Sequence, residues 1–253
     1  MQENNNSTLI PIFGDIHGNL EGLVNTVKHL QKISKKRFRY VIQLGDFGYF
    51  RNSVKEKFRD DLEKGVYQHL NKKNVLNFDF KIIFIRGNHE DNSWLNHESD
   101  VHPEGMVTID NKIYFLPDGR GISMPIYSNQ REDIIIAGLG GISPESRPNK
   151  YLKDPLIAFT EKSLDKLLDA KGIDVLITHQ GTDKVLKGSK TITTLCEILK
   201  PKLHLHGHTH TQTYVEIDNV KSYGFAKMPK TKRPFVTRND FYGVLDLKDL
   251  NFN

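Results

Sequence analysis

Residues 9–19 read LIPIFGDIHGN, and this stretch decides the fold. Its first five residues are apolar, as in a strand that is buried on both faces, and polar residues follow directly at Asp15-Ile16-His17. Two further apolar runs, YVIQL at 40–44 and KIIFI at 81–85, also lead into polar clusters. Three strands that end in this way predict a parallel sheet with polar groups gathered along one edge.

Helical patterns separate these apolar runs. After the first run, apolar residues recur at helical spacing at Leu20, Leu23, Val24, Val27 and Leu30. A capping box at 53–56 (SVKE) predicts a second helix that continues to Leu70, and a short third helix is predicted around Trp94. The alternation of strands and helices indicates an α/β fold.

The second half of the chain has more closely spaced apolar runs. The dipeptides Asp110-Asn111 and Asp218-Asn219 separate such runs as hairpin turns do. We predict strands in DIIIAGL (133–139), DVLITH (174–179), KLHLHGH (202–208) and FYGVLDL (241–247), and helices at 159–168 and 192–199. We therefore expect one domain over residues 1–253, with a second half rich in antiparallel strands.

Composition narrows the class of protein. Of the 253 residues, 37% are hydrophobic and 26% are charged, which is typical of a globular chain. The amino terminus, MQENNNST, has no signal-peptide pattern, and no run of about 18 apolar residues occurs. We expect a cytoplasmic protein that does not enter a membrane. Cys196 is the single cysteine and lies in an apolar helical pattern, so any metal ion needs His, Asp, Asn or Glu ligands.

Five polar clusters lie at the ends of predicted strands. They are Asp15-Ile16-His17, Gly45-Asp46, Gly87-Asn88-His89-Glu90, Thr178-His179 and Gly207-His208-Thr209-His210. Any one of these clusters alone is weak evidence for a metal site, because Asp-x-His is common in turns and the Asp of a Gly-Asp pair often caps a helix. Together they predict a site for two metal ions, since two cations need a shared anionic ligand and these oxygens and imidazoles suit manganese, iron or zinc.

Two more histidines accompany the last cluster. His204 and His206 alternate along the predicted strand, and we expect them to pack or to form hydrogen bonds rather than to bind metal.

The five clusters together resemble the signature of the calcineurin-like metallophosphoesterase superfamily, from Asp15 to His210. The resemblance implies an αββα sandwich with mixed sheets, helices outside and the site at one rim. It also implies two ligand sets that share Asp46 as a bridge: Asp15, His17, Asp46 and His210 for one metal, and Asp46, Asn88, His179 and His208 for the other. His89 corresponds to the residue that protonates the leaving group.

The expected activity is hydrolysis of a phosphate ester by a hydroxide that bridges two divalent cations, with Mn²⁺ as first choice and Fe or Zn as alternatives. A nuclease or cyclic-nucleotide phosphodiesterase is the main alternative, and a noncatalytic scaffold is a further one. Protein serine/threonine phosphatases carry Gly-Asp-x-Val-Asp-Arg-Gly where residues 45–51 read GDFGYFR, which argues against that substrate class.

A phosphate group usually needs a cationic contact besides the metals. Four arginines lie near predicted loops: Arg51, Arg86, Arg120 and Arg147. We select Arg51 and Arg120 as the candidate substrate contacts, against the alternative that they are ordinary surface residues.

A basic stretch lies near the carboxyl terminus. Residues 219–239 contain no Asp or Glu and include Lys221, Lys227, Lys230, Lys232, Arg233 and Arg238, together with Tyr223 and Phe225. With a net charge of +5, such a segment could track nucleic acid by pairing with phosphates and stacking on bases. A solvated loop is the simpler interpretation, and no oligomeric state is predicted.

Overall fold

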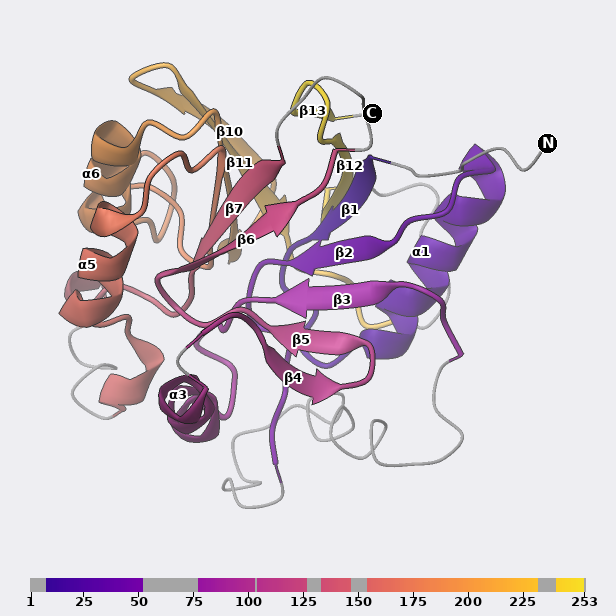
Figure 1. Cartoon of the computed structure of the whole chain (residues 1–253), viewed down its shortest axis with the longest axis horizontal. Coiled ribbons are helices and arrows are strands. Elements are labelled where there is room, and N and C mark those ends of the chain that lie inside the picture. Colours follow the sequence, from indigo (N-terminus) through magenta and orange to yellow (C-terminus); the bar gives the residue numbers. More distant parts are fainter. Residues whose placement is uncertain are drawn as a thin grey trace.

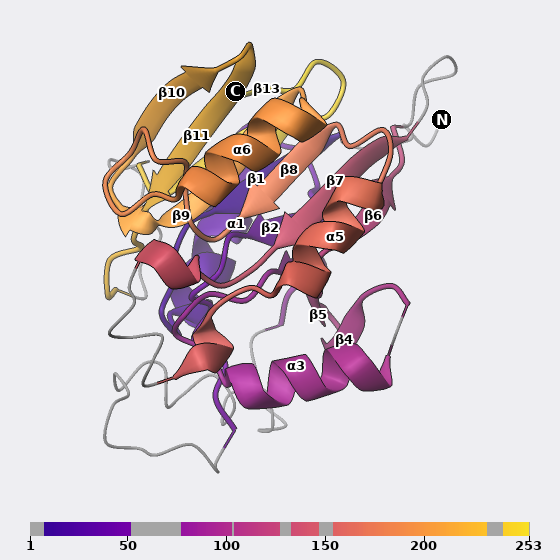
Figure 2. The same ribbon diagram turned by 90° about the vertical axis from the view of Figure 1, so that its left-hand side faces the viewer.

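A computed structural model describes residues 8–51, 77–102, 104–126, 133–146, 154–231 and 240–252. In these residues, two mixed sheets pack face to face with helices on the outer faces, as Figure 1 and Figure 2 show. The αββα sandwich that the sequence resemblance implied is confirmed.

The first sheet forms around the strand that opens the chain. Its strands, in spatial order, are β13 (Asn251–Phe252), β12 (Tyr242–Asp246), β1 (Leu9–Phe13), β2 (Tyr40–Gln43), β3 (Lys81–Phe84), β5 (Ile113–Phe115) and β4 (Val107–Asp110). Strands β1, β2, β3 and β5 run parallel, whereas β12 pairs antiparallel with β1. The three polar clusters of the first half therefore follow parallel strands, as predicted.

The second sheet comes from the second half of the chain. Its spatial order is β10 (Thr213–Ile217), β11 (Val220–Ala226), β9 (Leu203–His210), β8 (Val175–Thr178), β7 (Ile134–Leu139) and β6 (Arg120–Met124). Only the outer pairs β6–β7 and β10–β11 are antiparallel. Antiparallel pairs are frequent in the second half, as predicted (β4–β5, β6–β7, β10–β11, β1–β12 and β12–β13), but β7, β8, β9 and β11 also form three parallel pairs inside this sheet. Helices follow β7 and β8, and a helical crossover returns the chain to a parallel position.

The helices cover the outer faces of the two sheets. They are α1 (Leu20–Ser34), α3 (Asn92–Val101), α5 (Glu161–Asp169) and α6 (Lys190–Leu199), with short 3₁₀ helices η2 (Pro144–Ser146) and η3 (Pro155–Ile157). In Figure 1, α1 lies beside the first sheet, and α5 and α6 lie beside the second. The predicted helix over 53–70 falls outside the described residues. None of the described helices is long and apolar enough to cross a membrane.

Three apolar layers hold the sandwich together. Val27 of α1 packs with Phe84 on the outer face of the first sheet, and Ile42 and Ile177 belong to the layer between the sheets. Cys196 belongs to the third layer, under α5 and α6, where burial raises the pKa of its thiol to about 12. The parallel strands thus pack apolar side chains on both faces, and the five polar clusters lie where these strands end.

Both predicted hairpin turns are present. Asn111-Lys112 joins the antiparallel strands β4 and β5, one residue later than the predicted dipeptide, because Asp110 still pairs with Ile113, and Asp218-Asn219 joins β10 and β11. Asp218 and Asn219 have positive φ angles of 47° and 67°, which a two-residue hairpin turn of type I′ requires.

Candidate metal centre

The polar clusters meet at one rim because five strands end there. Strands β1, β2 and β3 are parallel neighbours, and so are β8 and β9. Their carboxyl ends carry the side chains of the seven predicted ligands: Asp15, His17, Asp46, Asn88, His179, His208 and His210. The structure brings all seven into one connected cluster of contacts.

Four of these side chains form a group that could hold a metal ion. Ligand atoms of Asp15, His17, Asp46 and His210 all lie within 4.8 Å of one another. His210 Nε2 lies 3.0 Å from Asp15 Oδ2, and His17 Nε2 lies 3.4 Å from Asp46 Oδ2. Ligands that bind one ion at 2.0–2.2 Å are roughly 3–3.5 Å apart, so these contacts fit a metal shell.

The other carboxylate oxygen of Asp46 faces a second set of side chains. Asp46 Oδ1 lies 3.4 Å from His179 Nε2, and this nitrogen lies 3.3 Å from Asn88 Oδ1. The rings of His179 and His208 are 4.9 Å apart. Asp46 therefore stands between the two predicted ligand sets, with one oxygen toward each.

The backbone at this rim adopts an uncommon conformation. His17, Asp46, His208 and His210 have positive φ angles of 43°, 53°, 63° and 60°. For a residue with a side chain, this left-handed conformation costs about 1–2 kcal/mol. Such strain persists where the surrounding structure enforces it, and it clusters at functional sites.

Close approach explains two of the glycines. A Cβ atom at Gly87 would lie 2.2 Å from both the backbone nitrogen and Oδ1 of Asp46. At Gly207 it would lie 2.3 Å from Asp15 Oδ1. Any side chain at either position would displace a carboxylate from the centre.

Both carboxylates are buried and ionised. Desolvation by burial raises the pKa of Asp46, but the charges of His179, His17 and His89 and the backbone hydrogen bond from His89 outweigh it, so the pKa lies below its ordinary value. Burial likewise raises the pKa of Asp15, and the hydrogen bond from His210 together with neighbouring histidine charges brings it below its ordinary value. Two buried anions need nearby positive charge, so the donor set fits a metal cofactor.

His89 lies at the edge of this cluster. Its ring is 4.9 Å from the ring of His17, and its backbone N–H donates to Asp46 Oδ1 at 2.7 Å. The ring is partly exposed.

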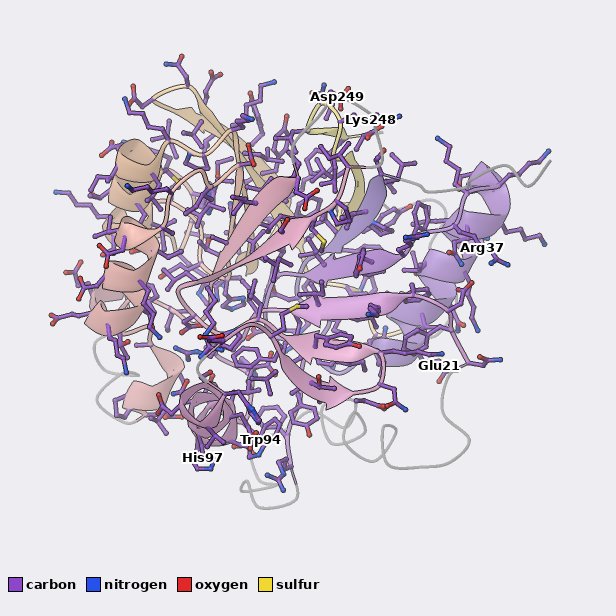
Figure 3. All side chains as sticks on the ribbon, viewed as in Figure 1. Glu21, Arg37, Trp94, His97, Lys248 and Asp249 are labelled. Atoms are coloured by element: carbon purple, nitrogen blue, oxygen red, sulfur yellow. The ribbon has the colours of Figure 1, made fainter. Side chains whose placement is uncertain are left out.

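The candidate arginines occupy different environments. The Arg51 guanidinium lies 5.0 Å from the ring centre of Trp94, which Figure 3 labels on α3. Arg120 begins β6 instead of lying in a loop, and it donates to the backbone oxygens of Ser99 and Gly105 at 2.6 and 2.9 Å. Arg120 thus binds the chain around the end of α3.

Arg86 and Arg147 complete the set of arginines. Arg86 is 1% exposed and pairs with Asp118 at 2.6 Å. It also donates to the carbonyl oxygens of Leu156 and Ala158. This side chain therefore ties loops together, and Arg147 lies outside the described residues.

The two interior histidines of β9 form hydrogen bonds away from the carboxylates. His204 contacts Thr178 Oγ1 and Ser222 Oγ, each at 2.8 Å. His206 contacts the backbone oxygen of Gly207 at 3.0 Å and Thr213 Oγ1 at 3.3 Å. The expectation that these two residues form hydrogen bonds is confirmed.

Glu90 and Arg86 are noted in the sequence, but the sequence does not predict the contacts that the structure shows for them. Glu90 is 6% exposed and accepts hydrogen bonds from the backbone of the Gly-Asp loop. Arg86 and Asp118 form a buried pair over 32 residues of sequence. Glu90 could have been noticed as part of the GNHE cluster, but no local pattern marks the Arg86–Asp118 pair.

Comparison with known proteins agrees with this geometry. The sequence matches the family described as calcineurin-like phosphoesterase over residues 9–212, and the chain belongs to this metal-dependent family. It is thereby a phosphoesterase by family. Comparison with curated proteins finds no match.

Solved structures share the fold at low sequence identity. One is TT1561 of Thermus thermophilus, with 16% identity, a TM-score of 0.52, and coverage of 97% of this chain and 96% of that one. Another is GAP50, described as the anchor in the inner membrane complex of Plasmodium, with 13% identity, a TM-score of 0.54, and coverage of 93% and 79%. At these identities the similarity concerns the fold.

Proposed function

We propose that the chain hydrolyses phosphate esters with two divalent metal ions, Mn²⁺ being the first choice and Fe or Zn the alternatives. Asp15, His17, Asp46 and His210 would hold one ion. Asp46, Asn88, His179 and His208 would hold the other. When bound, two such cations supply Lewis acidity toward phosphate oxygens and lower the pKa of a bound water.

The position of Asp46 is the observation that carries this proposal. Its Oδ2 lies 3.4 Å from His17 Nε2, and its Oδ1 lies 3.4 Å from His179 Nε2. Two separate sites would each need their own carboxylate, whereas a shared centre needs one carboxylate with an oxygen toward each ion. The other buried aspartate, Asp15, belongs to the first predicted set, so the second set has no carboxylate besides Asp46, which favours the shared arrangement.

The side chain of His89 supplies the proton in this proposal. Hydrolysis joins a water oxygen to phosphorus and breaks the ester P–O bond, and the departing oxygen takes a proton from His89. General acid catalysis of this kind contributes about 10²- to 10⁴-fold to the rate. The contact between the rings of His89 and His17 keeps this acid next to the first ligand set.

Two alternatives differ in what they require. Of the aromatics that could stack on bases of a single strand, Phe225 is 3% exposed and packs on Phe252, and Tyr223 packs between Tyr214 and Phe252. Lys232, Arg233 and Arg238 of the basic stretch lie outside the described residues. A noncatalytic scaffold is compatible with the fold, which a protein described as an anchor shares. The complete ligand set supports an enzyme over a scaffold, because function follows from the site and not from the fold.

A single assay panel tests the proposal. Purified protein loaded with Mn²⁺ would be given a chromogenic phosphomonoester, the matching diester and single-stranded DNA, each with a chelator control. We expect chelator-sensitive hydrolysis of a monoester or diester, with two metal ions per chain by elemental analysis. A protein that binds neither Mn²⁺, Fe nor Zn and hydrolyses nothing in the panel would contradict the proposal and support a scaffold. One domain over residues 1–253 and a cytoplasmic location stay predictions.

A further inference from the structure

We infer that Glu90 is a positioning residue that fixes the bridging carboxylate of Asp46 by binding the backbone of the loop that carries it. This inference rests on the proposed metal-dependent function. It assigns a task to a buried carboxylate that is not among the seven predicted ligands.

Three hydrogen bonds of Glu90 are directed at one short loop. Its Oε1 accepts a hydrogen bond from Phe47 N at 2.6 Å, and its Oε2 accepts from Gly48 N at 3.1 Å and Tyr49 N at 2.8 Å. Both oxygens of a side chain that is 6% exposed are thus used on three consecutive N–H groups. Hydrogen bonds from N–H groups to an ionised carboxylate are stronger than those between neutral groups.

The opposite side of the same loop is held by the segment that carries His17. The backbone oxygens of Asp46 and Phe47 accept from His17 N at 2.8 Å and Gly18 N at 2.9 Å. The N–H groups of the loop face Glu90, while its first two carbonyl groups face residues 17 and 18. The loop is therefore clamped between two segments that carry other predicted ligands.

The segment around Glu90 also binds the end of the loop and the Asp46 side chain. Asp91 N donates to Tyr49 O at 2.9 Å, and His89 N donates to Asp46 Oδ1 at 2.7 Å. Because Glu90 lies between these two donors in sequence, one stretch of three residues fixes both the carboxylate of Asp46 and the loop behind it.

Asp46 needs such support. It has a φ angle of 53°, and for a residue with a side chain this conformation is strained. The correct direction of both carboxylate oxygens depends on this conformation. Without the anion of Glu90, three buried N–H groups would lose their acceptor. The loop would then leave the conformation that holds Asp46 in order to satisfy these groups.

The substitution Glu90→Gln tests this role with little change in volume. Glutamine has one acceptor oxygen and an NH₂ group, so its NH₂ would face at least one backbone N–H donor. We expect affinity for at least one Mn²⁺ to fall about 10- to 100-fold, the size of effect seen when a partner of a metal ligand is removed. We expect kcat to fall with little change in KM, and partial recovery at saturating Mn²⁺.

The readouts separate positioning from a general loss of structure. Equilibrium dialysis with elemental analysis would measure Mn²⁺ binding, electron paramagnetic resonance would report the coupling of the two ions, and circular dichroism of metal-free protein would report the fold. Glu98→Gln is a matched control on α3, where Glu98 Oε2 lies 3.6 Å from the half-exposed His102. This control should behave as wild type in all three measurements.

The outcomes are distinct. Wild-type protein that binds no metal would overturn the proposed function and this inference with it. Wild-type protein that binds two coupled ions, together with a Glu90→Gln variant that binds them equally well, would overturn the inference alone. If the variant does not fold, hydrogen exchange of wild-type protein decides: we expect protection of the amides of residues 47–49 before metal is added, and exchange as fast as in an exposed loop would overturn the inference.

Discussion

Strand β9 carries four histidines in the sequence HLHGHTH at 204–210, and its two halves use them differently. In the interior half, His204 and His206 contact hydroxyl and carbonyl oxygens. At the strand exit, His210 Nε2 lies 3.0 Å from Asp15 Oδ2, and the backbone of His208 donates to Asp15 Oδ1 at 2.9 Å. The same residue type thus serves the fold in one half and the candidate centre in the other.

The difference has a backbone cause and an electrostatic cause. At the exit, the φ angles of His208 and His210 turn positive, which directs the chain around the carboxylates. In the interior, burial together with the charge of His206 lowers the pKa of His204 well below its ordinary value, and burial lowers the pKa of His206 to about 4. The interior histidines are therefore neutral near pH 7, and they behave as buried polar residues with satisfied hydrogen bonds.

Hydrogen-bond directions follow for His204. If Thr178 Oγ1 donates to the backbone oxygen of Gln180 at 2.5 Å, it accepts from His204 Nε2. The Nδ1 atom of the neutral ring then accepts from Ser222 Oγ. These three hydrogen bonds hold Thr178 and Gln180, the residues on either side of His179. The interior half of β9 thus stabilises the segment around His179 but contributes no predicted metal ligand.

The largest effect is expected from a substitution at the candidate metal centre, where the strands end. Asp46→Asn removes the charge shared by the two predicted ligand sets. We expect loss of at least one metal ion and, because Lewis acid stabilisation is worth several kcal/mol, a fall in kcat of roughly 10³-fold or more. Elemental analysis and steady-state kinetics measure this. Full metal occupancy in the variant would refute the bridging role.

A substitution beside the ligands should separate metal binding from proton transfer. For His89→Ala we expect kcat to fall about 10²- to 10⁴-fold, while metal content stays at the wild-type level. The measurement is turnover with metal analysis of the same sample. Unchanged turnover would remove His89 from the proposed mechanism.

A substitution in the interior half of β9 should lower the stability of the fold and leave metal binding and turnover nearly unchanged. His204→Ala removes the buried hydrogen-bond partner of Ser222 Oγ and one of the two partners of Thr178 Oγ1, and we expect the free energy of unfolding to fall by about 1–3 kcal/mol. Metal content and kcat of the folded fraction should stay within a few-fold of wild type. Urea unfolding and metal analysis check this, and loss of metal at full stability would contradict the division of the strand into two halves.

The smallest expected effect is on the pH dependence of stability. An unfolded His204 takes up a proton near the ordinary pKa of 6.5, whereas the folded one does so only well below it. The unfolded state therefore binds more protons, so the free energy of unfolding falls as pH drops from 7 to 5. Urea unfolding of metal-free protein should show a shallower fall for His204→Gln than for wild type. His97→Gln, at an exposed position on α3, should keep the wild-type slope.

Much of the fold could be predicted because its signals are local. The apolar runs of β1, β2 and β3, the helical spacing of α1 and the two hairpin turns depend on residues close in sequence. The sequence did not predict that β8 and β9 pair in parallel, because strand direction depends on how the helices between the strands cross the sheet.

For the candidate metal centre, too, some features could be predicted from the sequence and others could not. Sequence alone determined which residue types stand at the strand ends, and with them the family, because motif order and spacing are read along the chain. Only the tertiary structure decided that Arg86 pairs with Asp118 and that Glu90 binds the loop after Asp46. These are contacts between residues far apart in sequence, and a charged side chain takes its role from the partners that folding brings to it.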